Sequence, residues 1–286
     1  MSAYAYLNGD YLPAEEACVP VMDRGFLFGD SVYEVIPAYA GHAFHLDAHL
    51  DRLQNSLSAI GMDMPRTRDE WHRICAQLLS RFGREDAAIY VQVTRGVGAV
   101  RDHASVEGLE ATVFAMVRAL PAAPAEKKAA GISAITLDDI RWHRCDIKTT
   151  ALLANVLARA SAREEGADEA LLLRDGLVSE GAASNLFVVL DGLLVTPPKS
   201  SALLPGITRD LVLELATEAG IRYTEASIAA ADLERAEEIW TTSSTKEVLP
   251  VVKLNGRAVG AGKPGPLWHA MVKLFDAHKA RLQAGR

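Results

Sequence analysis

Residues 140–150 read IRWHRCDIKTT and contain Lys148, the residue on which the interpretation of the whole chain depends. A run of β-type residues, 132–137, precedes the stretch, and a helical pattern, 151–165, follows it. A lysine at such a junction, followed by small and hydroxylated residues, can be a buried amine that serves covalent chemistry. Most lysines are instead exposed to solvent. The stretch alone does not separate these two interpretations, so the rest of the chain has to.

The composition is that of a folded globular protein. The chain has 286 residues, 49% of them hydrophobic, which suffices for one large domain or two smaller ones. A net charge of −7 argues against a nucleic-acid-binding surface, which would normally be basic. No apolar run is long enough to span a bilayer, so we expect neither nucleic acid nor membrane as a partner.

The three cysteines indicate a reducing environment. Cys18, Cys75 and Cys145 are odd in number and far apart, and they fit neither a disulfide framework nor the spacing of a metal site. The first residues also lack the basic and apolar layout of a signal peptide. We therefore expect a cytoplasmic protein that binds no metal.

The N-terminal half alternates strand patterns with two helical patterns. Asn8-Gly9 is a strong signal for a hairpin turn, and Thr67 with Glu70 predicts a capping box at the start of a helix. Residues 23–31, with two glycines and two acids, predict an irregular loop. Strands are expected over residues 4–7, 11–13, 31–39, 87–94 and 111–117, and helices over 47–60 and 67–82.

Residues 119–131 are the best linker candidate, because they hold two prolines, six alanines and no β pattern. We therefore predict a domain over 1–120 and a second over 121–286. Hairpins outnumber βαβ units, which predicts an α+β fold of two domains. In the second half, strands are expected over 132–137, 170–173, 178–180, 185–190, 193–195, 238–242, 251–254 and 257–259, and helices over 151–165, 209–219 and 267–282.

Three features could bind an anion. Thr208 follows a Pro-Gly turn and is expected to cap helix 209–219, whose N-terminus favours negative charge. Residues 242–245, TSST, form a hydroxyl-rich end to a strand, and Arg52 lies on a predicted helix. Each also has an ordinary interpretation, as a helix cap, a polar turn and a surface arginine. They indicate a phosphate site only if they converge.

Two further features suit a planar ring and a carboxylate. Glu180 ends a strand and is followed by Gly181-Ala182-Ala183, whose small side chains let a ring approach the backbone. A carboxylate beside a pyridine nitrogen keeps that nitrogen protonated. Arg101 and His103 point the same way on an extended backbone and could clamp a carboxylate. The alternatives are a solvated glutamate and a solvated loop.

Five motifs in order together resemble one family: residues 23–34, 49–53, 144–148, 180–187 and 204–209, which read DRGFLFGDSVYE, HLDRL, RCDIK, EGAASNLF and LPGITR. They are similar to the class IV, or fold type IV, pyridoxal-phosphate aminotransferases, from near residue 4 to near residue 275. The resemblance implies a small N-terminal α/β domain, a larger C-terminal domain with a barrel-like sheet that binds pyridoxal 5′-phosphate (PLP), and a homodimer.

The resemblance also implies a role for each motif residue. Lys148 is similar to the lysine that binds PLP covalently and then moves the substrate proton, and Glu180 to the partner of the pyridine nitrogen. Leu204 is similar to the residue that packs on the ring. The residues expected around the phosphate are Arg52, Ile207, Thr208, Ser243 and Ser244.

Within the family, the chain most resembles D-amino-acid transaminases. Tyr33, Arg101 and His103 match their carboxylate trap, in which the arginine and histidine come from the neighbouring subunit. The implied reaction is ping-pong transfer of the amino group between D-amino acids (D-alanine, D-glutamate) and 2-oxo acids (2-oxoglutarate, pyruvate). The alternatives are a branched-chain L-aminotransferase, an (R)-amine transaminase, an aminodeoxychorismate lyase, or a PLP-binding protein without catalysis.

Overall fold

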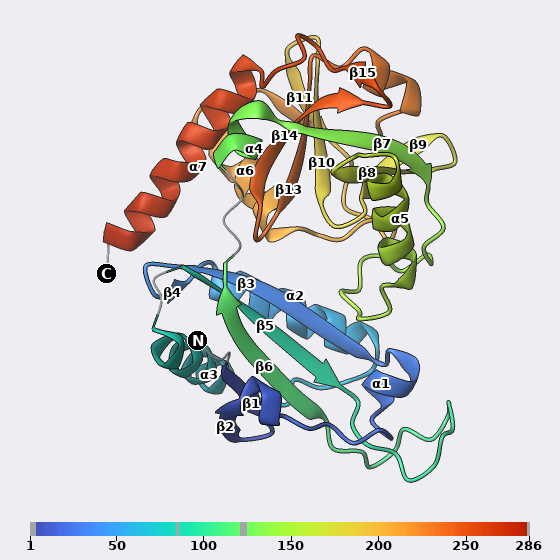
Figure 1. Ribbon diagram of the computed structural model, residues 1–286, viewed down its shortest axis with the longest axis vertical. Coiled ribbons are helices and arrows are strands. Elements are labelled where there is room, and N and C mark those ends of the chain that lie inside the picture. The colour runs from blue at the N-terminus through green and yellow to red at the C-terminus, as the bar shows by residue number, and fades with distance from the viewer. Residues whose placement is uncertain (1–3, 84–85, 121–124, 285–286) are drawn as a thin grey trace. The chain divides into compact units, whose positions relative to one another are not determined.

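The computed structural model describes residues 4–83, 86–120 and 125–284. The chain forms two compact units (Figure 1), Met1–Pro121 with Ile147–Leu152, and Ala122–Asp146 with Leu153–Arg286. The predicted domains, 1–120 and 121–286, stay a prediction, and they did not assign residues 147–152 to the first unit. Of the predicted linker, residues 121–124 lie outside the described residues, and Ala125–Ala130 form helix α4.

The first unit is built on an antiparallel sheet, in which the described residues supply six strands in the order β2-β1-β6-β5-β3-β4. The predicted hairpin at Asn8-Gly9 is confirmed, and Asn8 has the positive φ, 52°, that such a tight turn requires. The strands are β1 (Tyr4–Leu7), β2 (Asp10–Pro13), β3 (Ser31–Tyr39), β4 (His42–Ala43), β5 (Ala87–Thr94) and β6 (Thr112–Ala119).

Two helices, α2 (Leu46–Ala59) and α3 (Arg68–Phe82), pack on this sheet (Figure 1). Leu53 and Leu57 from α2 and Trp71 from α3 are fully buried in one core with residues of β3 and β5. The predicted capping box is confirmed, since Thr67 and Glu70 bond each other's backbone. The core therefore fixes α2 against β3, the arrangement on which Arg52 depends.

The prediction of an irregular loop over residues 23–31 is wrong. Arg24–Phe28 form a short helix, α1. The side chain of Asp23 accepts a hydrogen bond from the N–H of Gly25 at its start. Gly29 ends it with a φ of 65°, which glycine adopts without strain. Asp23 and Gly29, which contributed to the loop prediction, are thus the residues that cap the two ends of a helix.

The second unit is built on a mixed sheet that curls into a half-barrel (Figure 1), and its nine strands are counted over the described residues. Strands β14 and β7, β7 and β8, and β11 and β12 pair in parallel. The strands are β7 (Ile132–Asp138), β8 (Glu169–Arg174), β9 (Leu177–Gly181), β10 (Asn185–Leu190), β11 (Leu193–Thr196), β12 (Tyr223–Glu225), β13 (Glu238–Ser243), β14 (Glu247–Leu254) and β15 (Arg257–Ala258).

Three helices contact strands of this sheet: α5 (Leu153–Glu164), α6 (Ile207–Glu218) and α7 (Pro266–Ala284). Contacts join α6 and α7 to β13, where Trp240 is fully buried. Helix α6 begins at Ile207 with Gly206 as its N-cap, so the prediction that Thr208 caps the helix is wrong. Across the described residues, no helix is both long and apolar enough to cross a membrane.

Candidate active site

Lys148 is anchored to the first unit by its own backbone. Its carbonyl accepts a hydrogen bond of 2.9 Å from the N–H of Tyr33 in β3, and its N–H donates one of 3.2 Å to Oγ of Ser56 in α2. The amine, Nζ, lies 4.3 Å from the centroid of the Tyr33 ring. Lys148 is half-buried. The structure therefore disfavours a freely solvated lysine and pairs its amine with Tyr33.

The residues beside Lys148 hold it in this place. Ile147 is buried in the core of the first unit. Thr149 forms an antiparallel bridge with Val32, and the N–H of Thr150 donates a hydrogen bond of 3.2 Å to the carbonyl of Ser31. A short stretch thus pairs with the start of β3, and its central lysine is fixed by neighbours on both sides.

Arg52 is buried on α2 and is held by a carboxylate of β3. Its Nε and Nη2 donate hydrogen bonds of 2.7 and 2.8 Å to the two oxygens of Glu34, and Nδ1 of His49 lies 2.7 Å from Oε2 of the same carboxylate. Burial alone would raise the pKa of Glu34, but the Arg52 guanidinium and His49 hold it well below its ordinary value. Arg52 is therefore an oriented cation rather than a surface arginine.

The imidazole of His49 is buried between these charges. Burial lowers the pKa of His49 below its ordinary value of 6.5, Glu34 opposes this, and the nearby cations of Arg52 and Lys148 add to it. His49 is consequently a neutral hydrogen-bond partner of Glu34 at neutral pH. The sequence motif of residues 49–53 contains His49 but did not indicate a role for it, because its partner, Glu34, lies on a different element.

Arg101 and His103 lie in the loop between β5 and β6 and contact one aromatic residue. The His103 ring centroid is 4.8 Å from that of Phe28, and the Arg101 guanidinium is 5.0 Å from it. Both side chains are exposed. The structure thus brings Lys148 and Tyr33 together, and brings Arg101 and His103 together on Phe28.

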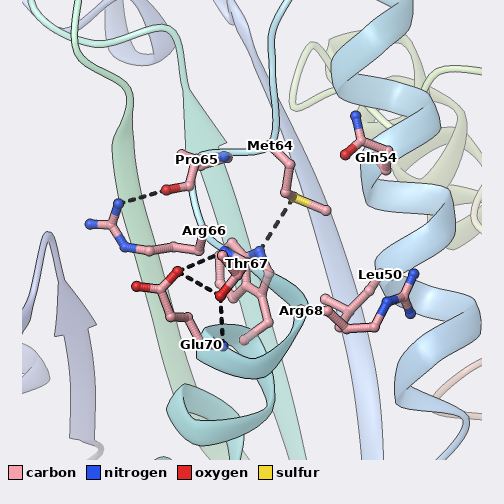
Figure 2. A pocket seen from close by; sticks show the side chains of 9 residues that line it. Leu50, Gln54, Met64, Pro65, Arg66, Thr67, Arg68 and Glu70 are labelled. Atoms are coloured by element: carbon pink, nitrogen blue, oxygen red, sulfur yellow. Dashed lines mark hydrogen bonds between the residues drawn. The ribbon is translucent and has the colours of Figure 1, made fainter.

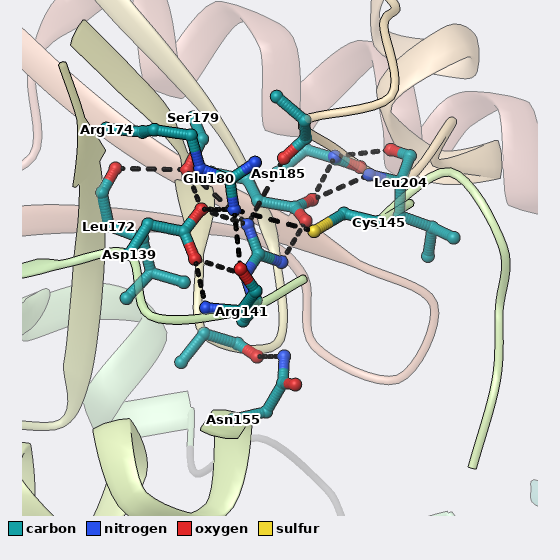
Figure 3. A network of polar contacts seen from close by, with 12 residues as sticks. Asp139, Arg141, Cys145, Asn155, Leu172, Arg174, Ser179, Glu180, Asn185 and Leu204 are labelled. Carbon is teal, nitrogen blue, oxygen red and sulfur yellow. Dashed lines mark hydrogen bonds and ion pairs between the residues drawn. The ribbon is translucent and has the colours of Figure 1, made fainter. Parts of the chain in front are cut away.

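Glu180 lies at the end of β9 in the second unit, and it is buried rather than solvated. Figure 3 shows its contacts. Oε1 accepts a hydrogen bond of 2.5 Å from Nη1 of Arg141, and Oε2 accepts bonds of 3.0 and 3.1 Å from Nδ2 of Asn185 and the N–H of Leu204. These three donors fix the orientation of the carboxylate.

Asp139 supports Arg141 from the other side (Figure 3). Nε and Nη2 of Arg141 donate hydrogen bonds of 2.9 Å to its two oxygens. Burial would lower the pKa of Arg141, but Asp139 and Glu180 raise it above its ordinary value. Burial would raise the pKa of Asp139, which Arg141 and Ser179 lower. Arg141 belongs to residues 140–150, but the sequence did not indicate its role, because Glu180 lies 39 positions further along the chain.

The start of α6 lies against Asn185. A Cβ on Gly206 would come within 1.8 Å of Oδ1 of Asn185, so only glycine fits at this helix cap. Ile207 and Thr208 follow in the first turn, where backbone N–H groups have no partner within the helix. Those groups and the helix dipole make this end suitable for a phosphate. Leu204 also contacts Asn185, because its carbonyl accepts a hydrogen bond of 2.7 Å from Nδ2 of Asn185.

The hydroxyl-rich end of β13 lies beside Asn185. Thr242 is the cross-strand partner of Asn185, which places the two side chains on the same face of the sheet. Oγ1 of Thr242 is buried and finds no hydrogen-bond partner within the part of the chain that the structure describes. A buried hydroxyl without a partner is costly, which indicates that a bound group completes it. Ser243 and Ser244 follow and are half-buried.

A cavity of about 420 Å³ lies elsewhere in the first unit, at the start of α3 (Figure 2). Polar groups that line this cavity already bind one another. The carboxylate of Glu70 accepts a hydrogen bond from the N–H of Thr67, and Nε1 of Trp71 lies 3.3 Å from Sδ of Met64. The cavity contains none of the residues expected to bind PLP. Its lining residues are Leu50, Gln54, Met64, Pro65, Arg66, Thr67, Arg68, Glu70 and Trp71.

Comparison with known proteins decides the family. The model of the family described as amino-transferase class IV matches residues 31–254. The chain belongs to this family. Members use PLP, and one solved relative, a hypothetical aminotransferase from Mycobacterium tuberculosis in a PLP-bound form, is 26% identical with a TM-score of 0.85, covering 96% of this chain and 98% of that one. This enzyme is accordingly a PLP-dependent aminotransferase, and the predicted family, fold and cofactor are confirmed.

Two groups of relatives bear on the substrate. A D-alanine aminotransferase from Bacillus licheniformis is 42% identical over 260 residues, covering 91% of each chain. One from Staphylococcus haemolyticus is 36% identical over 274 residues, covering 96% of each. A branched-chain amino acid aminotransferase from Escherichia coli has a TM-score of 0.86 at 29% identity, covering 96% of this chain and 93% of that one.

The residues of the aminotransferase fit the cofactor that its family uses. Glu180 is an oriented, buried carboxylate suited to a protonated ring nitrogen. The start of α6 and the buried hydroxyl of Thr242 are suited to phosphate oxygens. Lys148 presents an amine that is anchored by its backbone. Each requirement of PLP thus has a matching group in the chain.

Proposed function

We propose that this enzyme is a D-amino-acid transaminase that moves amino groups between D-amino acids, such as D-alanine and D-glutamate, and 2-oxo acids, such as 2-oxoglutarate and pyruvate, in a ping-pong cycle. The D-alanine aminotransferases, at 36–42% identity over nearly the whole chain, support this substrate class. The structural observation that carries the proposal is the position of the Lys148 amine, 4.3 Å from the centre of the Tyr33 ring. A tyrosine whose ring lies beside the reacting amine can contribute its hydroxyl to binding the substrate carboxylate.

The residues divide into those that hold PLP and one that reacts. Lys148 would hold PLP covalently, and its Nζ would take the proton from the substrate α-carbon. Glu180 would keep the ring nitrogen protonated, and Leu204 would pack on the ring. Bound PLP supplies an electron sink for the bonds at the substrate α-carbon. The residues proposed to hold the phosphate are Arg52, Ile207, Thr208, Ser243 and Ser244, and the start of α6 would supply N–H groups.

Substrate carboxylate binding is assigned to Tyr33 together with Arg101 and His103 of the neighbouring subunit. An arginine gives a carboxylate two parallel hydrogen bonds, and the histidine adds a third donor. The exposure of both loop side chains is consistent with a role outside their own chain.

Such a site requires a homodimer. Leu153, Val156 and Leu157 on α5 recur at helical spacing and are 71%, 58% and 50% exposed. An apolar stripe of this kind is typical of a protein interface. We assign it to the dimer contact. We also place the enzyme in the cytoplasm, because all three of its cysteines are unpaired.

The alternative with a specific observation behind it is branched-chain aminotransferase activity, since solved structures of that class align with TM-scores of 0.86–0.90. A turnover assay with 2-oxoglutarate separates the two. We expect D-alanine to be used faster than L-leucine, and chiral chromatography to identify the glutamate formed as the D-enantiomer. Faster use of L-leucine with L-glutamate as product would overturn the proposal. The absence of turnover by protein that retains PLP would favour a non-catalytic binder.

A further inference from the structure

We propose that Arg24 is a positioning residue for the loop that carries Arg101 and His103, and that it thereby sets the affinity of the enzyme for the substrate carboxylate. The inference rests on the proposed function, because it assigns the carboxylate to this loop. Arg24 lies outside the residues that we expect to touch substrate or PLP.

Arg24 is a buried cation whose donors bind the backbone of the loop. It begins α1 and is 5% exposed. Its Nη1 donates a hydrogen bond of 2.6 Å to the carbonyl of Asp102, and its Nη2 donates one of 3.0 Å to the carbonyl of His103. A longer contact, 3.4 Å, joins Nη1 to the carbonyl of Ser105. One guanidinium therefore binds two successive carbonyls, those of Asp102 and His103, in the loop that carries Arg101 and His103.

Other side-chain hydrogen bonds in this loop join its own residues, since the N–H of Ala104 and Oγ of Ser105 donate to the carboxylate of Asp102. Residues 101–110 contain no helix or strand. Hydrogen bonds from a charged donor contribute more than those between neutral groups, and the planar guanidinium fixes their directions. Because Asp102 lies between Arg101 and His103, the direction of its carbonyl determines how the backbone presents both neighbours. The contacts of Arg24 thus act on the geometry of the clamp.

Helix α1 adds a second support through Phe28. Its ring lies 4.9 Å from the Arg24 guanidinium, 5.0 Å from that of Arg101 and 4.8 Å from the His103 ring. Cations above an aromatic face are attracted by its quadrupole. The backbone of the loop is therefore held by Arg24, while its side chains rest on a residue one turn along the same helix.

The chain offers a matched control in Arg95. Arg24 and Arg95 each donate a hydrogen bond of 2.8 Å from Nε to Oδ2 of Asp30. Burial would raise the pKa of Asp30, but these two arginines lower it below its ordinary value. Nη2 of Arg95, however, donates to the carbonyl of Ile60 at 2.7 Å. Replacing either arginine by lysine removes the same kind of ion pair with Asp30, but only one replacement releases the carbonyls of Asp102 and His103.

The experiment compares the PLP-loaded wild-type enzyme with Arg24→Lys and Arg95→Lys. KM and kcat are measured for D-alanine and for (R)-1-phenylethylamine, an amine without a carboxylate, and amide hydrogen exchange is measured over residues 101–106. We expect Arg24→Lys to raise KM for D-alanine about tenfold, the effect of losing one charged hydrogen bond. Its kcat should change less than about twofold, its KM for the amine should be unchanged, and its loop should exchange faster. Arg95→Lys should leave all of these near wild-type values.

Two results would overturn the proposal: equal KM changes for D-alanine in both variants, or wild-type exchange rates in the loop of Arg24→Lys. If Arg24→Lys does not fold, Phe28→Leu tests the same support, and an unchanged KM for D-alanine and unchanged exchange would overturn it. Failure of the wild-type enzyme to use D-alanine would refute the proposed function. The exchange measurement would then still decide whether Arg24 positions the loop.

Discussion

Nη1 of Arg141 lies 2.5 Å from Oε1 of Glu180, and Asp139 binds the opposite edge of the same guanidinium. The carboxylate assigned to the ring nitrogen is thus one member of a buried chain of alternating charges. The orientation of Glu180 therefore depends on an arginine from another segment. The stability of the second unit should therefore depend on Arg141, the cation that binds both Asp139 and Glu180.

Replacement of Arg141 by methionine should destabilise the enzyme by about 3 kcal/mol, because removing one partner leaves buried charges uncompensated. The loss should lie at the low end of the usual range, since Arg174 also pairs with Asp139, at 2.9 Å. Denaturant unfolding measures the change. Arg144→Met is the control, since Arg144 pairs with Asp146 at the surface and its loss should change stability little. Equal effects of the two variants would contradict a structural role for the network.

Lys148→Ala should keep bound PLP through the phosphate site but lose its covalent attachment and nearly all turnover. A general base contributes about 10²–10⁴ in rate, and kcat should fall by at least that factor. Borohydride reduction followed by mass spectrometry measures the covalent link, and the exposed Lys253→Ala is the control. Cofactor still fixed to the Lys148→Ala protein would show that another lysine carries it.

Arg101→Ala should raise KM for D-alanine by a factor of about ten or more, because a charged bidentate contact is lost. Amines without a carboxylate should be used as before. Steady-state kinetics with both substrates measure the difference. A similar rise in KM for both would remove Arg101 from the carboxylate site.

His49 should make the enzyme less stable as the pH falls from 7 to 5. Its pKa in the folded protein lies below the ordinary value of 6.5, because burial disfavours the charged ring. Below pH 6.5 the unfolded chain therefore binds a proton that the folded chain does not, and protonation favours unfolding. His49→Asn retains a donor toward Glu34 and should flatten this pH dependence. Urea unfolding across this pH range is the measurement, and identical slopes for wild type and His49→Asn would refute the prediction.

Val156→Glu should separate the proposed dimer. A charge placed in the apolar stripe of α5 would have to be desolvated at the interface. Analytical ultracentrifugation should detect monomers, and D-alanine turnover should fall because the proposed site takes Arg101 and His103 from the neighbouring subunit. Leu177→Glu, at an exposed apolar residue outside α5, is the control. A Val156→Glu protein that remains dimeric would place the interface elsewhere.

Local signals in the sequence were sufficient for much of the fold. Asn8-Gly9 requires a tight turn, and Thr67 with Glu70 satisfies the first N–H groups of a helix, so both elements formed as predicted. Helix α1 was missed because five residues are too few to show a helical period. The start of α6 was displaced because glycine, rather than threonine, is the cap there.

The site was less accessible to sequence reasoning, because its positions are set by distant partners. The motif around Glu180 suggested a carboxylate for a ring nitrogen, but nothing local indicated that Arg141 would bind it. Likewise, the residues around Arg52 did not separate a surface arginine from an anion-binding one, and nothing local indicated that Glu34 of β3 would hold it. Periodicity and turn chemistry describe neighbours along the chain, whereas these ion pairs join residues up to 39 positions apart.

The burial of Ile147 in the core of the first unit has a consequence for the order of folding during synthesis. Domains usually fold as units as they leave the ribosome. Here, the first unit also needs residues 147–152, which follow a stretch that belongs to the second unit. A nascent chain that ends near residue 121 would lack both the buried isoleucine and the bridge from Thr149 to Val32. We therefore expect its stable fold to appear only after Lys148, the proposed catalytic residue, has emerged, so that no completed first unit forms without it.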